Sequence, residues 1–115
     1  MAVTIYHNPR CSKSRETLRL LRDRGVEPDV VEYLKTPPDA ATLERLLGQL
    51  GLEPRELMRL KEPPYRELGL DDPAKSRGEL IAAMVENPVL IERPIVVKDG
   101  KAAIGRPPEK VLEIL

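Results

Sequence analysis

The feature of this sequence that most constrains its fold is the separation of its strand-forming residues into two blocks. In the first block, residues 3–6 and 29–33 are short runs rich in β-branched and aromatic side chains. Between them, residues 11–24 place leucines on one helical face, and Gly25 is expected just past the end of that helix. A strand, a helix and a strand over about 30 residues predict a βαβ unit with parallel strands.

The second block lies near the other end of the chain. Residues 94–97 and 102–104 are β-forming runs that flank Asp99 and Gly100, and Asp-Gly between such runs strongly indicates a two-residue hairpin. Two prolines at positions 107 and 108 then open a final helix through residue 115. A βαβ unit followed at a distance by a hairpin and a helix is the thioredoxin-like arrangement, although another small α/β layout fits the same pattern.

The residues between the two blocks predict helices. Asp39 is a good N-cap. Apolar side chains follow it at i, i+3, i+4 and i+7, namely Leu43, Leu46, Leu47 and Leu50. Pro54 suits the first turn of a further helix, residues 61–64 are expected to form a loop, and Ser76 and Glu79 have the spacing of a capping box. We therefore expect one α/β domain over residues 1–115, with a thioredoxin-like fold and a helical insertion between its halves.

Composition excludes several classes of function. The 19 basic residues are balanced by 19 acidic ones, so no net field attracts nucleic acid or an anionic membrane. No apolar run approaches the roughly 20 residues of a membrane span, and the first residues lack the basic start of a signal peptide. A single cysteine agrees with a reducing compartment. We expect a cytoplasmic monomer that binds neither nucleic acid nor membranes.

The only cysteine, Cys11, falls where the first predicted strand turns into the first helix. Unpaired N–H groups and the positive end of the helix dipole favour a thiolate there, with a pKa of roughly 3.5–7.5 in comparable positions. Arg10, Lys13 and Arg15 add positive charge nearby. A buried structural cysteine is the alternative. The polar flanking residues, and the position at the carboxyl end of a parallel strand, favour a reactive nucleophile.

Several known cysteine motifs are incomplete around Cys11, and this limits the reactions that its thiol can carry out. Ser14 occupies the second cysteine position of a Cys-x-x-Cys pair, which excludes dithiol exchange within the chain. Thr17 stands where the Cys-x5-Arg loop of phosphatase-like enzymes has arginine. One cysteine and one histidine do not supply the usual metal ligands, so we expect no metal and no bound cofactor. An oxidised Cys11 must then be resolved by an external thiol such as glutathione. His7 either tunes the thiolate or is a solvated loop residue.

The sequence resembles the glutaredoxin-linked arsenate reductase family of the ArsC type, and is most similar to its short YfgD-like members. The first matching segment is HNPRCSKSRET, residues 7–17. The likeness continues through residues 33–38, 55–59, 64–70, 92–97 and 104–109. It therefore covers essentially the whole chain in order. Ser12 and Lys13 depart from the Gly-Thr pair of well-studied resistance enzymes.

The resemblance implies a role for particular residues. Cys11 corresponds to the nucleophile, His7 to the histidine associated with the thiol and Ser14 to the serine that can form a hydrogen bond with the sulfur. The three arginines that bind the oxyanion correspond to Arg59, Arg93 and Arg106, and Pro94 corresponds to the cis-proline beside the cysteine. Without the resemblance, each of these arginines would be interpreted as a solvated surface group. A guanidinium suits a tetrahedral oxyanion because it donates two parallel hydrogen bonds and keeps its charge.

The implied activity is arsenate reduction for arsenic detoxification. Arsenate would bind at the first helical turn, Cys11 would attack it, and glutathione as co-substrate with glutaredoxin would supply the reducing thiols before arsenite leaves. Two alternatives remain open. The related Spx proteins share the fold and bind RNA polymerase as regulators, although many use a Cys-x-x-Cys switch that is missing here. A glutathione-linked thiol oxidoreductase could also act on another oxyanion or on a mixed disulfide.

Overall fold

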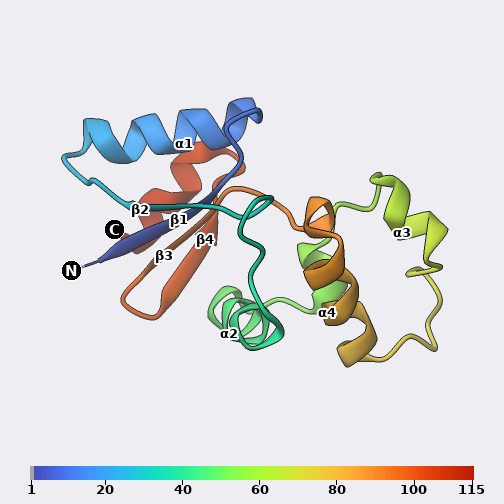
Figure 1. Cartoon of the computed structure of the whole chain (residues 1–115). Helices are drawn as coiled ribbons and strands as arrows, with labels where there is room; N and C mark the ends of the chain where they lie inside the picture. The colour runs from blue at the N-terminus through green and yellow to red at the C-terminus, as the bar shows by residue number, and fades with distance from the viewer. Residues whose placement is uncertain (1) are drawn as a thin grey trace. The chain divides into compact units, whose positions relative to one another are not determined.

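The computed structural model describes residues 2–115, and their contacts divide into two compact units. The first unit combines the beginning of the chain, through Thr36, with Arg93–Leu115, and the second is Pro37–Glu92. Figure 1 shows that the four strands all belong to the first unit, whereas the second is built from helices and loops. The division matches the predicted helical insertion between two β-containing halves.

The first unit is built on a mixed sheet of four strands in the order β2-β1-β3-β4. The strands are β1 (Val3–His7), β2 (Asp29–Glu32), β3 (Ile95–Lys98) and β4 (Lys101–Ile104). β1 is parallel to β2 and antiparallel to β3, which in turn is antiparallel to β4. The connection from β1 to β2 is the helix α1 (Ser12–Asp23). This α/β arrangement confirms the thioredoxin-like fold class.

One face of the sheet is covered by helical segments from both ends of the chain. Inward-facing residues alternate along β1, and Ile5 pairs with Val96 of β3 so that both lie on the same face. These two pack in one buried cluster with Leu21 of α1 and with Val111 of η3 (Pro108–Ile114), a 3-10 helix. Because α1 is fixed through its apolar side, its first turn is held above the carboxyl end of β1.

The turns of the first unit use the residues that their geometry requires. Asp99 and Gly100 both have positive φ, at 52° and 78°, which is the type I′ geometry of a two-residue hairpin. Gly25 has a φ of 78° immediately after α1 and its C-cap residue. Both predictions made from the sequence are therefore confirmed.

The second unit contains two longer helices and several short ones. They are α2 (Ala40–Leu50), η1 (Pro54–Leu57), α3 (Pro63–Glu67), α4 (Arg77–Glu86) and η2 (Pro88–Leu90), of which η1 and η2 are 3-10 helices. The buried apolar side chains include Leu43, Leu46, Leu47, Leu57, Leu80, Ile81 and Met84. The helical spacing of leucines after Asp39 thus marks the buried face of α2, and the Asp39 carboxylate accepts the N–H of Thr42 at 2.8 Å.

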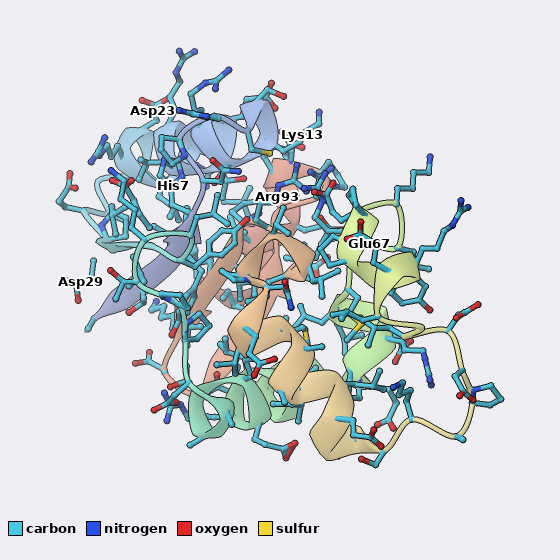
Figure 2. The ribbon with its side chains drawn as sticks, turned by 45° about the vertical axis from the view of Figure 1, so that its right-hand side comes forward. His7, Lys13, Asp23, Asp29, Glu67 and Arg93 are labelled. Carbon is cyan, nitrogen blue, oxygen red and sulfur yellow. The ribbon has the colours of Figure 1, made fainter. Side chains whose placement is uncertain are left out.

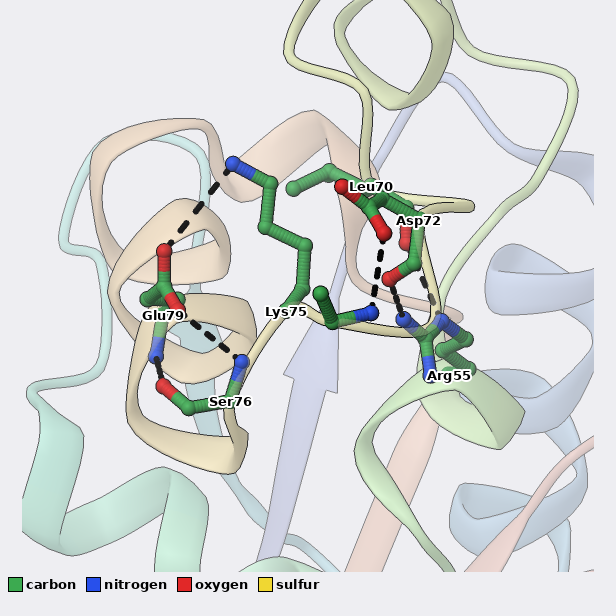
Figure 3. Close-up of polar contacts among 7 residues, drawn as sticks. Arg55, Leu70, Asp72, Lys75, Ser76 and Glu79 are labelled. Atoms are coloured by element: carbon green, nitrogen blue, oxygen red, sulfur yellow. Dashed lines mark hydrogen bonds and ion pairs between the residues drawn. The ribbon is translucent and has the colours of Figure 1, made fainter.

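Polar side chains fix the loop that precedes α4. The guanidinium of Arg55 donates to the carbonyl of Leu70 at 3.0 Å and to that of Asp72 at 2.6 Å, as Figure 3 shows. Ser76 and Glu79 form a complete capping box, because each side chain accepts the backbone N–H of the other residue. The capping box predicted from the sequence is confirmed.

Several element boundaries differ from the prediction. The expected loop at residues 61–64 is wrong in its second half, because α3 begins at Pro63. Proline suits a first helical turn, where its missing N–H costs no hydrogen bond. α1 begins one residue after Cys11, β2 ends before Tyr33, and the final helix is 3-10 rather than α. The single domain over residues 1–115 stays a prediction.

The helices among residues 2–115 are all too short or too polar to cross a membrane.

The capping box gives a direct test of the α4 boundary. We expect Ser76→Ala to lower the free energy of unfolding by about 1 kcal/mol, because the N–H of Glu79 loses its acceptor. Urea denaturation monitored by circular dichroism measures this change. The matched control is Ser12→Ala, at the exposed first residue of α1, with an expected change within about 0.5 kcal/mol. Equal effects of the two substitutions would contradict the role given to Ser76.

Candidate functional site

Cys11 is the N-cap residue of α1. Its backbone is extended, with φ of −96° and ψ of 125°, so that the chain turns here from the loop after β1 into the helix. The N–H of Cys11 donates to the carbonyl of Asn8, and its own carbonyl accepts the N–H of Arg15, both at 3.0 Å. These two bonds fix the backbone on either side of the thiol. Only 8% of the residue is exposed, yet it lies outside the apolar cluster of the first unit.

The surroundings of Cys11 favour the thiolate. Burial by itself raises the pKa of the thiol, but the backbone N–H groups of Ser14 and Lys13 and the charges of Arg93 and Arg106 together bring it below its ordinary value of 9.0. The Cys11 side chain forms no capping hydrogen bond. The helix N-terminus favours the thiolate through the positive ends of its backbone N–H dipoles. A buried but inert structural cysteine would have an apolar environment and a raised pKa instead.

Arg106 is the cationic side chain in contact with the sulfur. Its Nη2 donates to Cys11 Sγ at 3.7 Å, and its Nε donates to the carbonyl oxygen of Arg93 at 2.9 Å. The two donors of one rigid guanidinium are thus used in different directions, which fixes the plane of the group beside the thiol. Arg93 is itself 9% exposed, and its charge also lowers the pKa of Cys11. The Arg93–Pro94 peptide is cis, which is the conformation that the resemblance implies.

His7 and Ser14 form a buried pair beside the thiol. His7 Nδ1 and Ser14 Oγ are 2.7 Å apart, and Ser14 Oγ also accepts the N–H of Asn8 at 3.0 Å. The interpretation of His7 as a solvated loop residue is wrong, because it is the last residue of β1 and is buried. Burial is also the main cause that lowers its pKa from 6.5, so the imidazole is neutral at pH 7. Its direct partner is Ser14, which lies three residues after Cys11 in α1.

The proposed site residues are divided between the two units. Figure 2 shows Lys13 and Arg93 at the same end of the first unit, with Asp23 at the opposite end of α1. Cys11 and Arg106 join them there through the contact described above. Arg59 belongs to the second unit, where its N–H donates to the carbonyl of Leu90 and its guanidinium pairs with Glu62 at 3.5 Å. A role for Arg59 beside the thiol stays a prediction.

Two residues of this region were missed by the sequence analysis. Asn8 shapes the loop before Cys11, since its side chain also accepts the N–H of Arg10 at 3.0 Å. Gly105 has no room for a side chain, because a Cβ atom there would collide with Thr17 and Pro94. Its position directly before Arg106 is the one sequence signal that could have drawn attention to it. Among residues 2–115, no three His, Cys, Asp or Glu side chains form a group that could hold a metal ion.

The lowered pKa of Cys11 predicts fast alkylation below the ordinary thiol range. Only the thiolate reacts, so the rate of modification by iodoacetamide should rise with a midpoint pH below 9.0. We expect Arg106→Gln to move this midpoint upward, because the thiolate loses a neighbouring positive charge. Arg19→Gln, which removes an exposed charge from α1, is the matched control and should leave it unchanged. Equal midpoints for all three proteins would contradict the electrostatic role of Arg106.

The neutral state of His7 predicts a loss of stability in mild acid. The unfolded chain takes up the proton near pH 6.5, whereas the folded chain takes it up only at lower pH. Between these values the unfolded state binds more protons, so the free energy of unfolding falls as the pH falls below 6.5. Urea denaturation at several pH values measures it. His7→Asn should flatten the dependence in this window, which no other histidine can produce. A dependence as steep as that of the unchanged chain would refute the assignment.

Comparison with known proteins identifies the family. The family model of the ArsC family matches residues 6–114. Escherichia coli K12 has a relative called "Uncharacterized protein YfgD", 67% identical over 98% of this chain and 96% of its own length. An arsenate reductase of Rhizobium meliloti is 52% identical over all of this chain and 82% of its own length. The solved structure of an arsenate reductase from Vibrio cholerae aligns with a TM-score of 0.98 and 59% identity, covering 100% of this chain and 98% of that one. This chain therefore belongs to the ArsC family.

Proposed function

We propose that this chain is an oxidoreductase that reduces arsenate to arsenite with Cys11 as its nucleophile. The observation that carries the proposal is the contact between Arg106 and the Cys11 sulfur, in surroundings that lower the pKa of the thiol. The names of the relatives support arsenate as the substrate. A thiolate beside fixed guanidinium groups combines an attacking atom with groups that neutralise an incoming oxyanion.

In the first step, arsenate binds beside the first turn of α1, where backbone N–H groups point outward. Arg93 and Arg106 neutralise its oxygens, and we assign the same task to Arg59. The Cys11 thiolate then forms a bond with arsenic, and one arsenic–oxygen bond breaks. The departing oxygen leaves as water after protonation. Arsenic remains arsenic(V), because this step exchanges one ligand for another.

The second step needs a thiol from outside the chain, because Cys11 is the only cysteine of the sequence. We assign this role to glutathione. Its sulfur bonds to arsenic, and a second arsenic–oxygen bond breaks as that oxygen leaves as water. The glutaredoxin thiolate then bonds to the glutathione sulfur, and the electron pair of the glutathione–arsenic bond stays on arsenic, which becomes arsenic(III) while the two thiols become a mixed disulfide. Water finally replaces the Cys11 sulfur on arsenic, so that arsenite leaves and Cys11 regains its proton.

Glutathione and glutaredoxin also indicate the compartment. Both keep thiols reduced in the cytosol, whereas secreted proteins face oxidising conditions. We accordingly assign the chain to the cytoplasm, where it would contribute to arsenic detoxification. Monomeric action is sufficient for the two steps, since each uses one active thiol.

The activity test measures arsenite produced from arsenate with glutathione and glutaredoxin. We expect Cys11→Ser to reduce the rate to background, and Arg106→Lys to lower kcat/KM by about 10²-fold, because lysine cannot reproduce the two-directional guanidinium contacts. Arg19→Lys is the matched control on the exposed side of α1 and should keep the activity. Omission of either glutathione or glutaredoxin should stop turnover.

Three results would contradict the proposal. Arsenite formation by Cys11→Ser would remove the nucleophile from the mechanism. Multiple turnover without an external thiol would contradict the second step. Absence of turnover in the unchanged chain, together with its co-purification with RNA polymerase, would favour the regulatory alternative that the resemblance to Spx proteins leaves open.

A further inference from the structure

We propose that Gly105 is a positioning residue for Arg106. Because glycine has no side chain, the segment directly after β4 can lie close to α1 and to Pro94, and this places the Arg106 guanidinium beside Cys11. The predicted loss of arsenate turnover rests on the proposed function. The predicted position of the Arg106 guanidinium beside the Cys11 sulfur does not.

The first argument is the lack of space at Gly105. A Cβ atom at this position would lie 2.5 Å from Thr17 Oγ1, 2.9 Å from Pro94 Cγ and 3.1 Å from Thr17 Cγ2. Contacts this short are repulsive, so any side chain here must displace one of its neighbours. Gly105 does not have a positive φ, unlike Gly100 of the hairpin. The requirement for glycine is therefore one of space and not of backbone conformation.

The second argument is that neither neighbour of Gly105 is free to yield. Thr17 is completely buried, and its hydroxyl donates to the carbonyl of Lys13 at 2.8 Å in the first turn of α1. Pro94 has a rigid ring, and its carbonyl accepts the N–H of Gly105 at 2.9 Å. A side chain at position 105 would therefore push the chain at this position away from α1.

The third argument connects this approach to the thiol. The next residue, Arg106, donates hydrogen bonds from Nη2 to the Cys11 sulfur and from Nε to the carbonyl oxygen of Arg93. Two parallel contacts thus join neighbouring residues, Gly105 to Pro94 through the backbone and Arg106 to Arg93 through the side chain. A shift of residue 105 moves the start of the Arg106 side chain, and with it the guanidinium that contacts the sulfur at 3.7 Å.

The test uses Gly105→Ala, with the midpoint pH of Cys11 alkylation by iodoacetamide as the main measurement. We expect the midpoint to rise toward that of Arg106→Gln, and kcat/KM for arsenate to fall by roughly tenfold to 10²-fold. Adding Thr17→Ala removes two of the three short contacts and should move the midpoint back toward that of the unchanged chain. Gly48→Ala is the matched control, since a Cβ there meets nothing within 4 Å, and it should leave both quantities unchanged.

The possible outcomes are all decisive. An unchanged midpoint in folded Gly105→Ala, or a raised midpoint that Thr17→Ala does not move back, would overturn the proposal. If circular dichroism shows that Gly105→Ala does not fold, Thr17→Ile presses on the same contact from α1 and must raise the midpoint, or the proposal is wrong. A raised midpoint in Gly105→Ala, together with no arsenate reduction by the unchanged chain, would support the positioning role and refute the proposed function.

Discussion

The contact between Arg106 and the Cys11 sulfur is the interaction on which the site depends. Cys11 is brought to the first turn of α1 by the strand that precedes it, and burial there opposes ionisation of the thiol. Two neighbouring guanidinium groups and two backbone N–H groups reverse that preference. The carbonyl of Arg93 holds Arg106 in place, and the close approach at Gly105 lets its backbone reach this position. The reactive form of one sulfur thus depends on residues from both ends of the chain.

Local patterns in the sequence were sufficient for most of the fold. The Asp99-Gly100 turn, the βαβ unit and the capping box at Ser76 are determined by residues close in sequence, so they could be predicted. The start of α3 at Pro63 was missed because two adjacent prolines indicate a turn and a first helical turn equally well. The 3-10 geometry of η3 has no period in the sequence that distinguishes it from a short α-helix.

The site was only partly predictable from individual residues. Cys11 could be found because a strand-to-helix turn is a local feature that makes a thiol reactive. Arg93 and Arg106 could be assigned only through the resemblance, since the direction of a long surface side chain is decided by tertiary contacts. The constraint at Gly105 arises where Thr17 of α1 meets the two ends of the β3–β4 hairpin, and no pattern within one of these segments reports it. Arg59, in the other unit, retains its assignment as a prediction.

The most direct measurement of the central claim is the ultraviolet absorbance of the thiolate as a function of pH, in the folded chain and in the same chain unfolded by urea. Because Cys11 is the only cysteine, the signal belongs to one sulfur, and Cys11→Ser supplies the baseline. The structure predicts that the thiolate signal of the folded chain develops at lower pH than that of the unfolded chain, whose thiol is no longer held near Arg93 and Arg106. Coincident curves, or a folded curve displaced to higher pH, would show that the fold does not stabilise the anion.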